Sequence, residues 1–203
     1  MPNQFIIAGI GTEIGKTLIS AIFRQALQAD YWKPVQSGNP EEADALFVQH
    51  MTEVPDGNIW ESTYVLTQPL SPHTAAEIDG VRISLDQMTL PPTQRPLIVE
   101  LAGGIMVPLN ENETNLELMA KLGLPVVLVS KNYLGSINHT LLTYELLKAR
   151  QIPMAGIVFN GPSNPSGEKF ILNHTGLKVL LRVPALSKID PEIIQEYAQQ
   201  ISL

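Results

Sequence analysis

The sequence predicts an α/β fold in which helices flank a parallel central β-sheet. Short apolar runs bounded by turn residues recur along the chain, as expected of strands that are buried on both faces. Segments with helical spacing lie between them, and this alternation is typical of a parallel sheet covered by helices. The expected strands are residues 5–10, 96–101, 125–130 and 154–160, and the expected helices are residues 16–28, 114–122, 136–150 and 191–201.

The last expected helix has the clearest start, because Asp190 is a good N-cap and Pro191 suits the first turn. Residues 39–96 are harder to assign, because their Pro-rich and polar segments show only weak periodicity. We find no internal repeat, low-complexity segment or linker. A length of 203 residues fits one domain, and residues 1–203 are predicted to form a single one.

The composition indicates a globular protein with a sizeable core, because 44% of the residues are hydrophobic and 16% are charged. The 13 Lys and Arg residues are outnumbered by 20 Asp and Glu residues and form no basic run, which argues against nucleic acid as a partner. The absence of Cys excludes disulfides and thiolate metal sites. We see no secretory signal and no apolar stretch near the roughly 18 residues of a membrane span, so we expect a cytoplasmic protein.

A glycine-rich segment, GIGTEIGKT at residues 9–17, connects the first expected strand to the first expected helix. Glycines let backbone N–H groups turn toward phosphate oxygens, Lys16 can reach the β- and γ-phosphates, and Thr17 can offer its hydroxyl to Mg²⁺. The spacing departs from the usual phosphate loop, since five residues separate Gly9 from Gly15 and three separate Gly11 from Gly15. A Gly-rich turn without a ligand is the alternative. The strand-loop-helix order favours a phosphate loop of the P-loop NTPase type.

Three charged side chains are candidates for a site beside this loop. Pro34 favours an extended backbone at Lys33, which would hold a second cation at a strand end, although a surface lysine is the alternative. Asp44 lies near a helix start, where its carboxylate could bind metal or simply favour the helix dipole. Glu100 is expected to end a buried strand at the edge where open α/β sheets bind ligands; a turn-capping Glu is the alternative.

Six motifs then occur in the order of one enzyme family: GTEIGKT (11–17), WKPVQSG (32–38), LSPH (70–73), ELAGG (100–104), LGSINH (134–139) and VFN (158–160). This set, with matches from residue 9 to about 186, resembles the dethiobiotin synthases. The resemblance implies a homodimeric P-loop enzyme of biotin synthesis. Its substrates would be 7,8-diaminononanoate, CO₂ (or bicarbonate) and MgATP, and its products dethiobiotin, ADP and phosphate.

The resemblance also implies the residues of the reacting centre. Lys16 and Lys33 would be catalytic, because they would neutralise the phosphates and the substrate carbamate. The ligands of Mg²⁺ would be Thr17, Asp44 and Glu100. The substrate would be bound by Ser37 at its carbamate or amine end and, across the dimer interface, by Ser136, Ile137 and Asn138 at its carboxylate; an ordinary Ser N-cap is the alternative for Ser136.

For ATP, the resemblance implies that Asn160 reads the adenine edge, although Asn160-Gly161-Pro162 is also a strong turn signal. Pro184, Ala185 and Leu186 would close over the ring. The full set implied for ATP is Glu13, Ile14, Gly15, Lys16, Thr17, Leu18, Asp44, Glu100, Leu101, Ala102, Gly103, Asn160, Gly161, Pro184, Ala185 and Leu186.

Four positions depart from the family pattern. Gly11 stands where many members carry Asp, Leu101 replaces a glycine, and Gly161 stands where an acid is common. A tyrosine that some members place near the substrate carboxylate has no counterpart between residues 161 and 180. The first three concern nucleotide selectivity and loop geometry, and the missing tyrosine concerns carboxylate binding.

Two other functions were considered. A switch ATPase of the partitioning or septum-placement kind resembles Lys-Gly-Gly near the loop start, where this chain has Ile10 and Gly11. Such proteins often end in a basic amphipathic helix, but residues 190–203 carry three acidic residues and no Lys or Arg. A nucleotide-binding protein without turnover is the second alternative, and the presence together of Lys16, Thr17, Lys33, Asp44 and Glu100 argues against it.

Overall fold

A seven-stranded parallel sheet forms the centre of the protein in the computed structural model, which describes residues 3–39, 41 and 43–203. The strands lie in the order β4-β2-β6-β1-β7-β8-β9, and each of their pairings is parallel. The predicted fold class is confirmed. The strands are β1 (Gln4–Gly9), β2 (Asp30–Trp32), β4 (Ile59–Trp60), β6 (Leu97–Gly104), β7 (Val126–Lys131), β8 (Met154–Asn160) and β9 (Val179–Val183).

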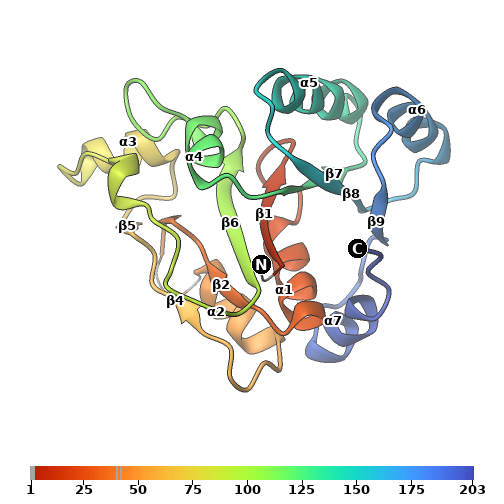
Figure 1. The fold of residues 1–203 in the computed structure, drawn as a ribbon, viewed down its shortest axis with the longest axis horizontal. Coiled ribbons are helices and arrows are strands. Elements are labelled where there is room, and N and C mark those ends of the chain that lie inside the picture. The colour runs from red at the N-terminus through yellow and green to blue at the C-terminus, as the bar shows by residue number, and fades with distance from the viewer. Residues whose placement is uncertain (1–2, 40, 42) are drawn as a thin grey trace.

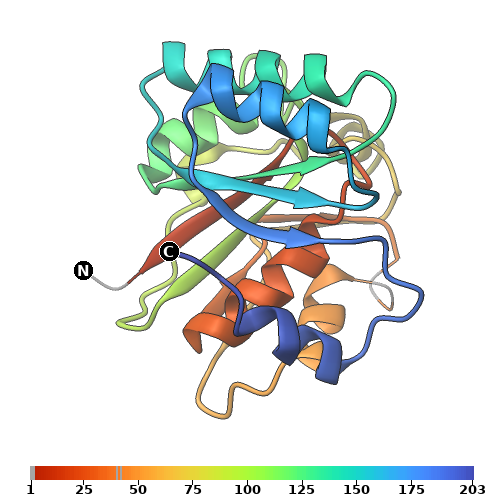
Figure 2. The same cartoon turned by 90° about the vertical axis from the view of Figure 1, so that its right-hand side faces the viewer.

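Helices cover both faces of this sheet, which makes three layers (Figure 2). One face carries α4 (Asn115–Leu122), α5 (Ser136–Ala149) and α6 (Pro165–Thr175), and the other carries α1 (Lys16–Leu27), α2 (Asp44–Met51) and α7 (Pro191–Ala198). Beyond one edge lie α3 (Pro72–Ile78), the 3-10 helix η2 (Leu85–Gln87) and a two-stranded sheet of β3 (Val35–Ser37) and β5 (Tyr64–Leu66) (Figure 1). No helix among the described residues is both long and apolar enough to span a bilayer.

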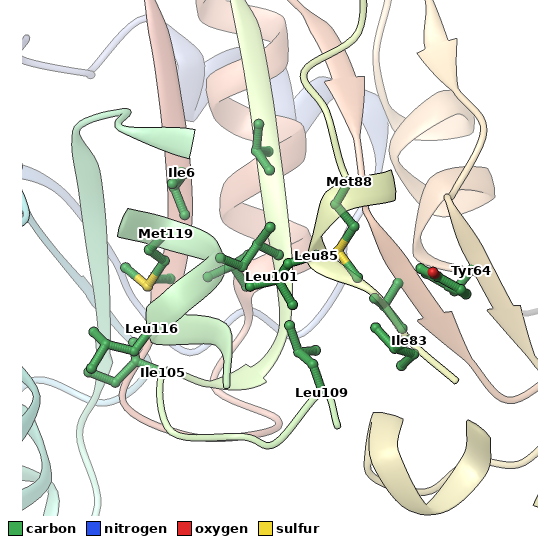
Figure 3. Close-up of a cluster of buried hydrophobic side chains, with 14 of the residues drawn as sticks. Ile6, Tyr64, Ile83, Leu85, Met88, Leu101, Ile105, Leu109, Leu116 and Met119 are labelled. Carbon is green, nitrogen blue, oxygen red and sulfur yellow. The ribbon is translucent and has the colours of Figure 1, made fainter. Parts of the chain in front are cut away.

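The central strands are buried on both faces because alternate side chains enter different cores. In β1, Ile7 packs in the cluster beneath α1, whereas Ile6 packs in the cluster beneath α4. Figure 3 shows the second cluster, in which the Leu101 side chain lies among those of Leu116, Met119 and Leu85. This two-sided burial is why the strands read as continuous apolar runs in the sequence.

The four predicted strands and four predicted helices are all present, with β8 at the predicted bounds. Strand β6 continues to Gly104, three residues past the predicted end. Asp190 caps α7 as predicted, because its Oδ1 accepts a hydrogen bond of 2.9 Å from the Ile193 N–H. No bounds were predicted for α2, α3, α6, β2, β3, β4, β5, β9 or η2, although a strand end was expected at Lys33 and a helix start near Asp44. Most of these elements are short, and two or three residues show too little periodicity to be recognised.

Asp30 fixes the position of β2, which leads into the Lys33 segment. Its side chain is fully buried and accepts hydrogen bonds from the Asn58 N–H at 2.8 Å and from Trp60 Nε1 at 3.1 Å. The Arg95 guanidinium lies 3.3 Å away. Burial by itself would raise the pKa of Asp30, but hydrogen bonds from Thr93, Asn58 and Trp60, with the charge of Arg95, outweigh burial and lower the pKa. Asp30 therefore joins β2 to its neighbours as a charged group.

We expect Asp30→Asn to lower the free energy of unfolding by about 2 kcal/mol near neutral pH, because an amide cannot replace a carboxylate as acceptor for all these donors. The folded-state pKa is depressed, so the stabilisation is present above the ordinary pKa of 3.8 and is lost as the pH falls through the lower, folded-state value. Urea unfolding of both proteins, followed by Trp fluorescence, should show a difference at pH 7 that shrinks below pH 4. A difference that stayed constant down to the acid transition would contradict this origin.

Candidate active site

The phosphate loop connects β1 to α1 at the carboxyl edge of the sheet. Gly15 is the N-cap of α1 in a left-handed conformation with φ of 90°, and no side chain caps the helix. The first N–H groups of an α-helix have no partner within the helix, so those of α1 are available to an anion. Lys16 Nζ donates to the Gly11 carbonyl at 3.1 Å, and Lys131 Nζ donates to the Glu13 carbonyl at 3.0 Å. The loop therefore has the shape and polarity of a phosphate site.

Asn160 supports this loop from β8. Its Nδ2 donates to the Ile14 carbonyl at 2.7 Å, and a Cβ added at Gly15 would lie 2.2 Å from the same nitrogen. Glycine is thus required at position 15 both by backbone conformation and by the closeness of Asn160. The Gly161 N–H bonds to the Val183 carbonyl at 2.9 Å, so Asn160 and Gly161 lie beside the start of residues 184–186. Their part in binding adenine stays a prediction.

Thr17, Lys33, Asp44 and Glu100 converge beside the loop. Thr17 Oγ1 lies 2.5 Å from Asp44 Oδ1 and 2.8 Å from Glu100 Oε1. Lys33 Nζ forms an ion pair with Asp44 and lies 3.9 Å from Glu100 Oε1. Lys33 is 7% exposed, so it is not the surface lysine of the alternative interpretation. Asp44 is in the first turn of α2, as the dipole interpretation required, but its carboxylate is also bonded to Thr17 and Lys33.

The expectation that Glu100 ends its strand was wrong. Glu100 is the fourth residue of the eight-residue β6, and it pairs with Ile7, two residues before β1 ends. Because side chains alternate along a strand, Glu100 points to the α1 face and Leu101 to the opposite core. Glu100 is 1% exposed and bonds to Thr17 on α1, so it is not a turn cap.

The charges in this cluster perturb one another. Burial lowers the pKa of Lys16, an effect that Glu100 opposes and Lys33 reinforces. For Asp44, burial acts to raise the pKa, but the charge and hydrogen bond of Lys33 and the hydrogen bond of Thr17 prevail and lower it. Asp44 is therefore an anion at neutral pH, as an oxygen ligand for a cation must be.

Two adjoining cavities open onto this cluster. The first, of about 420 Å³, is called here the Lys16 cavity, and it is lined by Thr12, Glu13, Gly15, Lys16, Thr17, Lys33, Asp44, Glu100, Leu101 and Gly103. The second, of about 490 Å³, is the Ser37 cavity, lined by Thr12, Lys33, Gln36, Ser37, Asp44, Pro69, Leu70, Ser71, Pro72, Ala102, Gly103 and Val107. Lys33 and Asp44 line both cavities, so they stand at the boundary between them. Ser37 Oγ is buried and finds no hydrogen-bond partner among the described residues.

Some predicted ATP-binding residues could act only through their main chain. The side chains of Ile14 and Leu18 lie in the core cluster beneath α1, and that of Leu101 lies in the cluster beneath α4 (Figure 3). Glu13 is in a left-handed conformation with φ of 56°, and its carbonyl is turned to Lys131. The Ile14, Leu18 and Leu101 side chains are therefore part of the core, and only main-chain groups at these three positions could contact a ligand.

Ser136, Ile137 and Asn138 lie apart from the other site residues within the chain. They begin α5, where Ile137 and Asn138 line a separate cavity with Tyr133, Leu134, Gly135, Asn132, Pro162, Ser163 and Asn164. Gly135 is the N-cap, so the alternative that made Ser136 the N-cap was wrong. Ser136 is buried, and its Oγ accepts a hydrogen bond of 3.3 Å from the Tyr133 N–H.

Sequence reasoning missed three residues of the site. Thr12 lines both cavities, Lys131 holds the loop carbonyl of Glu13, and Tyr31 donates from its hydroxyl to Glu100 Oε2 at 3.0 Å. Burial raises the pKa of Tyr31 far above its usual value, and the charges of Glu100 and Asp44 act in the same direction. The only sequence signal for Tyr31 was its position two residues before Lys33.

Comparison with known proteins agrees with this geometry. A family model described as an AAA domain matches residues 3–193. The chain is 44% identical to the ATP-dependent dethiobiotin synthetase BioD of Christiangramia forsetii over 98% of this chain and 96% of that protein. It is 48% identical to the BioD of Cytophaga hutchinsonii over 98% of this chain and 97% of that protein. The chain belongs to the dethiobiotin synthetase family.

Solved structures show how widely the fold of this dethiobiotin synthetase family member is shared. The MinC:MinD cell division protein complex of Aquifex aeolicus matches with a TM-score of 0.58 at 10% identity, over 98% of this chain and 91% of that one. Such low identity shows a common fold and no more. The identity to dethiobiotin synthetases is what separates the ligase from the switch ATPase, the alternative that shares the architecture.

The cluster fits a bound Mg²⁺ by its chemistry. The Thr17 hydroxyl has one hydrogen, yet two carboxylate oxygens lie within hydrogen-bonding distance of it, and it cannot donate to both. A hard cation among these oxygens would remove that conflict. Among the described residues no group of three or more His, Cys, Asp and Glu side chains is placed to hold a metal. Protein ligands limited to Thr17, Asp44 and Glu100 suit Mg²⁺ that keeps waters and binds substrate phosphates as well.

Proposed function

We propose that this chain is an ATP-dependent carbon-nitrogen ligase that converts 7,8-diaminononanoate, CO₂ and ATP to dethiobiotin, ADP and phosphate in biotin biosynthesis. Family membership supports the overall reaction. The observation that carries the chemistry is the position of Lys33, whose ammonium lies at the boundary of the Lys16 and Ser37 cavities. A cation there can contact both a nucleotide phosphate and an acceptor in the second cavity.

The proposed reaction has three steps. One substrate amine adds to CO₂ and releases a proton, which gives a carbamate. A carbamate oxygen takes the γ-phosphoryl group of ATP, which leaves as ADP. The second amine then attacks the carbamoyl carbon and expels phosphate, which closes the ureido ring. Because one bound diamine supplies both nucleophiles, holding it in place contributes much of the rate.

In this proposal, residues of the Lys16 cavity bind the nucleotide phosphates and residues of the Ser37 cavity bind the substrate. Lys16 and the loop N–H groups bind the β- and γ-phosphates, and Lys33 stabilises the negative charge shared by the phosphoryl group and the carbamate. The unpartnered hydroxyl of Ser37 is available to the carbamate or an amine of the substrate. A bound Mg²⁺, held by Thr17, Asp44 and Glu100, would neutralise phosphate charge and fix its orientation.

The same proposal includes a homodimer in the cytoplasm. Ser136, Ile137 and Asn138 begin α5 beside a separate cavity, so their N–H groups would serve the substrate carboxylate from a second copy of the chain. The free N–H groups of a helix start suit such an anion. The absence of Cys from the chain is compatible with the reducing cytoplasm.

We expect phosphate release from MgATP to require both 7,8-diaminononanoate and bicarbonate, because the phosphoryl acceptor is the carbamate and not water. A coupled phosphate assay with each component omitted in turn, together with mass spectrometry of dethiobiotin, measures this dependence. Release should fall to background when either component is absent. A high rate of ATP hydrolysis that is the same with and without the diamine would contradict the ligase proposal and favour a switch ATPase.

A further inference from the structure

Tyr31 lies in the middle of β2, fully buried, and touches the site from within the sheet. It pairs with Ile98 of the neighbouring strand β6. Side chains alternate along a strand, so Glu100 lies on the same face as Ile98, two residues farther toward the carboxyl edge. The Tyr31 ring spans that offset, and its hydroxyl donates to Glu100 Oε2 at 3.0 Å.

The two oxygens of Glu100 have different partners. Oε2 accepts from Tyr31, whereas Oε1 lies 2.8 Å from Thr17 Oγ1 and 3.9 Å from Lys33 Nζ. The carboxylate of a Glu side chain rotates readily about the Cγ–Cδ bond, because torsions between sp³ and sp² atoms have broad, shallow wells. The hydrogen bond that Tyr31, on a rigid strand, donates to one carboxylate oxygen restricts this rotation. Glu100 is 1% exposed, so water has little access to replace this donor.

We propose that Tyr31 is a positioning residue for the metal site: its hydroxyl binds Oε2 of Glu100, so that Oε1 is the oxygen that Glu100 would offer to a nucleotide-bound metal. This inference rests on the proposed function, in which Glu100 is a metal ligand. Tyr31 itself does not line the Lys16 cavity. Its effect is to fix which carboxylate oxygen faces Thr17 and Lys33.

The bond between Tyr31 and Glu100 is charge-assisted, and such bonds are about twice as strong as those between neutral groups. Without the hydroxyl, Oε2 would be a buried acceptor with no donor, and the carboxylate would turn toward another partner. Partners that orient metal ligands typically change metal affinity by about 10- to 100-fold when removed. Metal affinity is therefore the quantity that should respond.

The experiment compares Tyr31→Phe with the wild type by titrating Mn²⁺ in the presence of ADP and following free Mn²⁺ by electron paramagnetic resonance. The dissociation constant of Mn²⁺ should rise by about 10-fold or more. Binding of ADP in EDTA should stay within about twofold of the wild type. Introducing 4-aminophenylalanine at position 31, which restores an N–H donor on the same ring, should recover most of the affinity. Unchanged Mn²⁺ affinity in Tyr31→Phe would overturn the proposal.

Tyr144→Phe is the matched control. Tyr144 is also buried and donates its hydroxyl to a single acceptor, the Thr175 carbonyl at 3.0 Å, but it joins α5 to α6 away from the metal residues. This variant should lower the temperature of unfolding without changing Mn²⁺ affinity. If Tyr144→Phe weakens Mn²⁺ binding as much as Tyr31→Phe does, the weaker binding comes from a general loss of stability of the fold, and the positioning role is wrong.

Glu100→Gln separates the two proposals. Weaker Mn²⁺ binding in Glu100→Gln with no effect of Tyr31→Phe would overturn the role of Tyr31 and leave the metal site standing. Unchanged Mn²⁺ binding in Glu100→Gln would overturn the metal site, and the role of Tyr31 with it. Weakening in both variants, with rescue by 4-aminophenylalanine, is the result that supports both.

Discussion

Lys33→Met is expected to bind nucleotide and yet to form almost no dethiobiotin. The ammonium of Lys33 stands between the Lys16 and Ser37 cavities, where negative charge moves from ATP to the carbamate. Removing one preorganised group of this kind typically costs about 100- to 1,000-fold in kcat. Lys16 and the loop N–H groups remain, so the affinity for ADP should change much less. Methionine is also unbranched and ends one atom short of Nζ, so the main change is the loss of the ammonium group.

Product formation by mass spectrometry and ADP binding by calorimetry together measure this effect. Lys121→Met is the control, because Lys121 also lies near a carboxylate, with Nζ 3.4 Å from Asp86, but its side chain is 34% exposed and it lines neither cavity. That control should keep near-normal turnover. Unchanged turnover in Lys33→Met would remove its catalytic role, and an equal loss of ADP binding would make it a nucleotide-binding residue instead.

Gly15→Ala is expected to lose nucleotide binding by about 100-fold or more, or about 2.7 kcal/mol. Its left-handed φ of 90° disfavours a side chain, and a Cβ would lie 2.2 Å from Asn160 Nδ2. Asn160 would have to release the Ile14 carbonyl, and the loop N–H groups would turn away from the phosphates. Alanine thus affects both the loop and the strand that supports it.

Gly11→Ala, in the same loop, is the matched control. A Cβ at Gly11 meets no atom within 4 Å, so the loop should keep its shape and its affinity for ADP. Calorimetric titration with MgADP, preceded by thermal unfolding without nucleotide, separates loss of the site from loss of the fold. Equal affinities in the two variants would contradict the assigned role of Gly15.

Patterns along the chain gave much of the fold and the site. The apolar runs of β1 and β8 are visible because both faces of the strands are buried, and a helix start such as Asp190-Pro191 depends on neighbouring residues alone. The elements between residues 43 and 96 have eight residues or fewer, so their periodicity is too brief to interpret. Their arrangement follows from packing against the rest of the chain.

Residue order by itself determined the strand-loop-helix unit, with Lys16 and Thr17, and the family to which the chain belongs. Only the tertiary structure decided which groups meet there. Tyr31 and Glu100 are 69 positions apart, and Ile14 and Asn160 are 146 apart. The physical reason is that strand order and register bring such residues together, whereas periodicity reports only on neighbours within a turn or two. For the same reason Glu100 reaches Thr17 from the middle of β6, and residues 136–138 open a separate cavity.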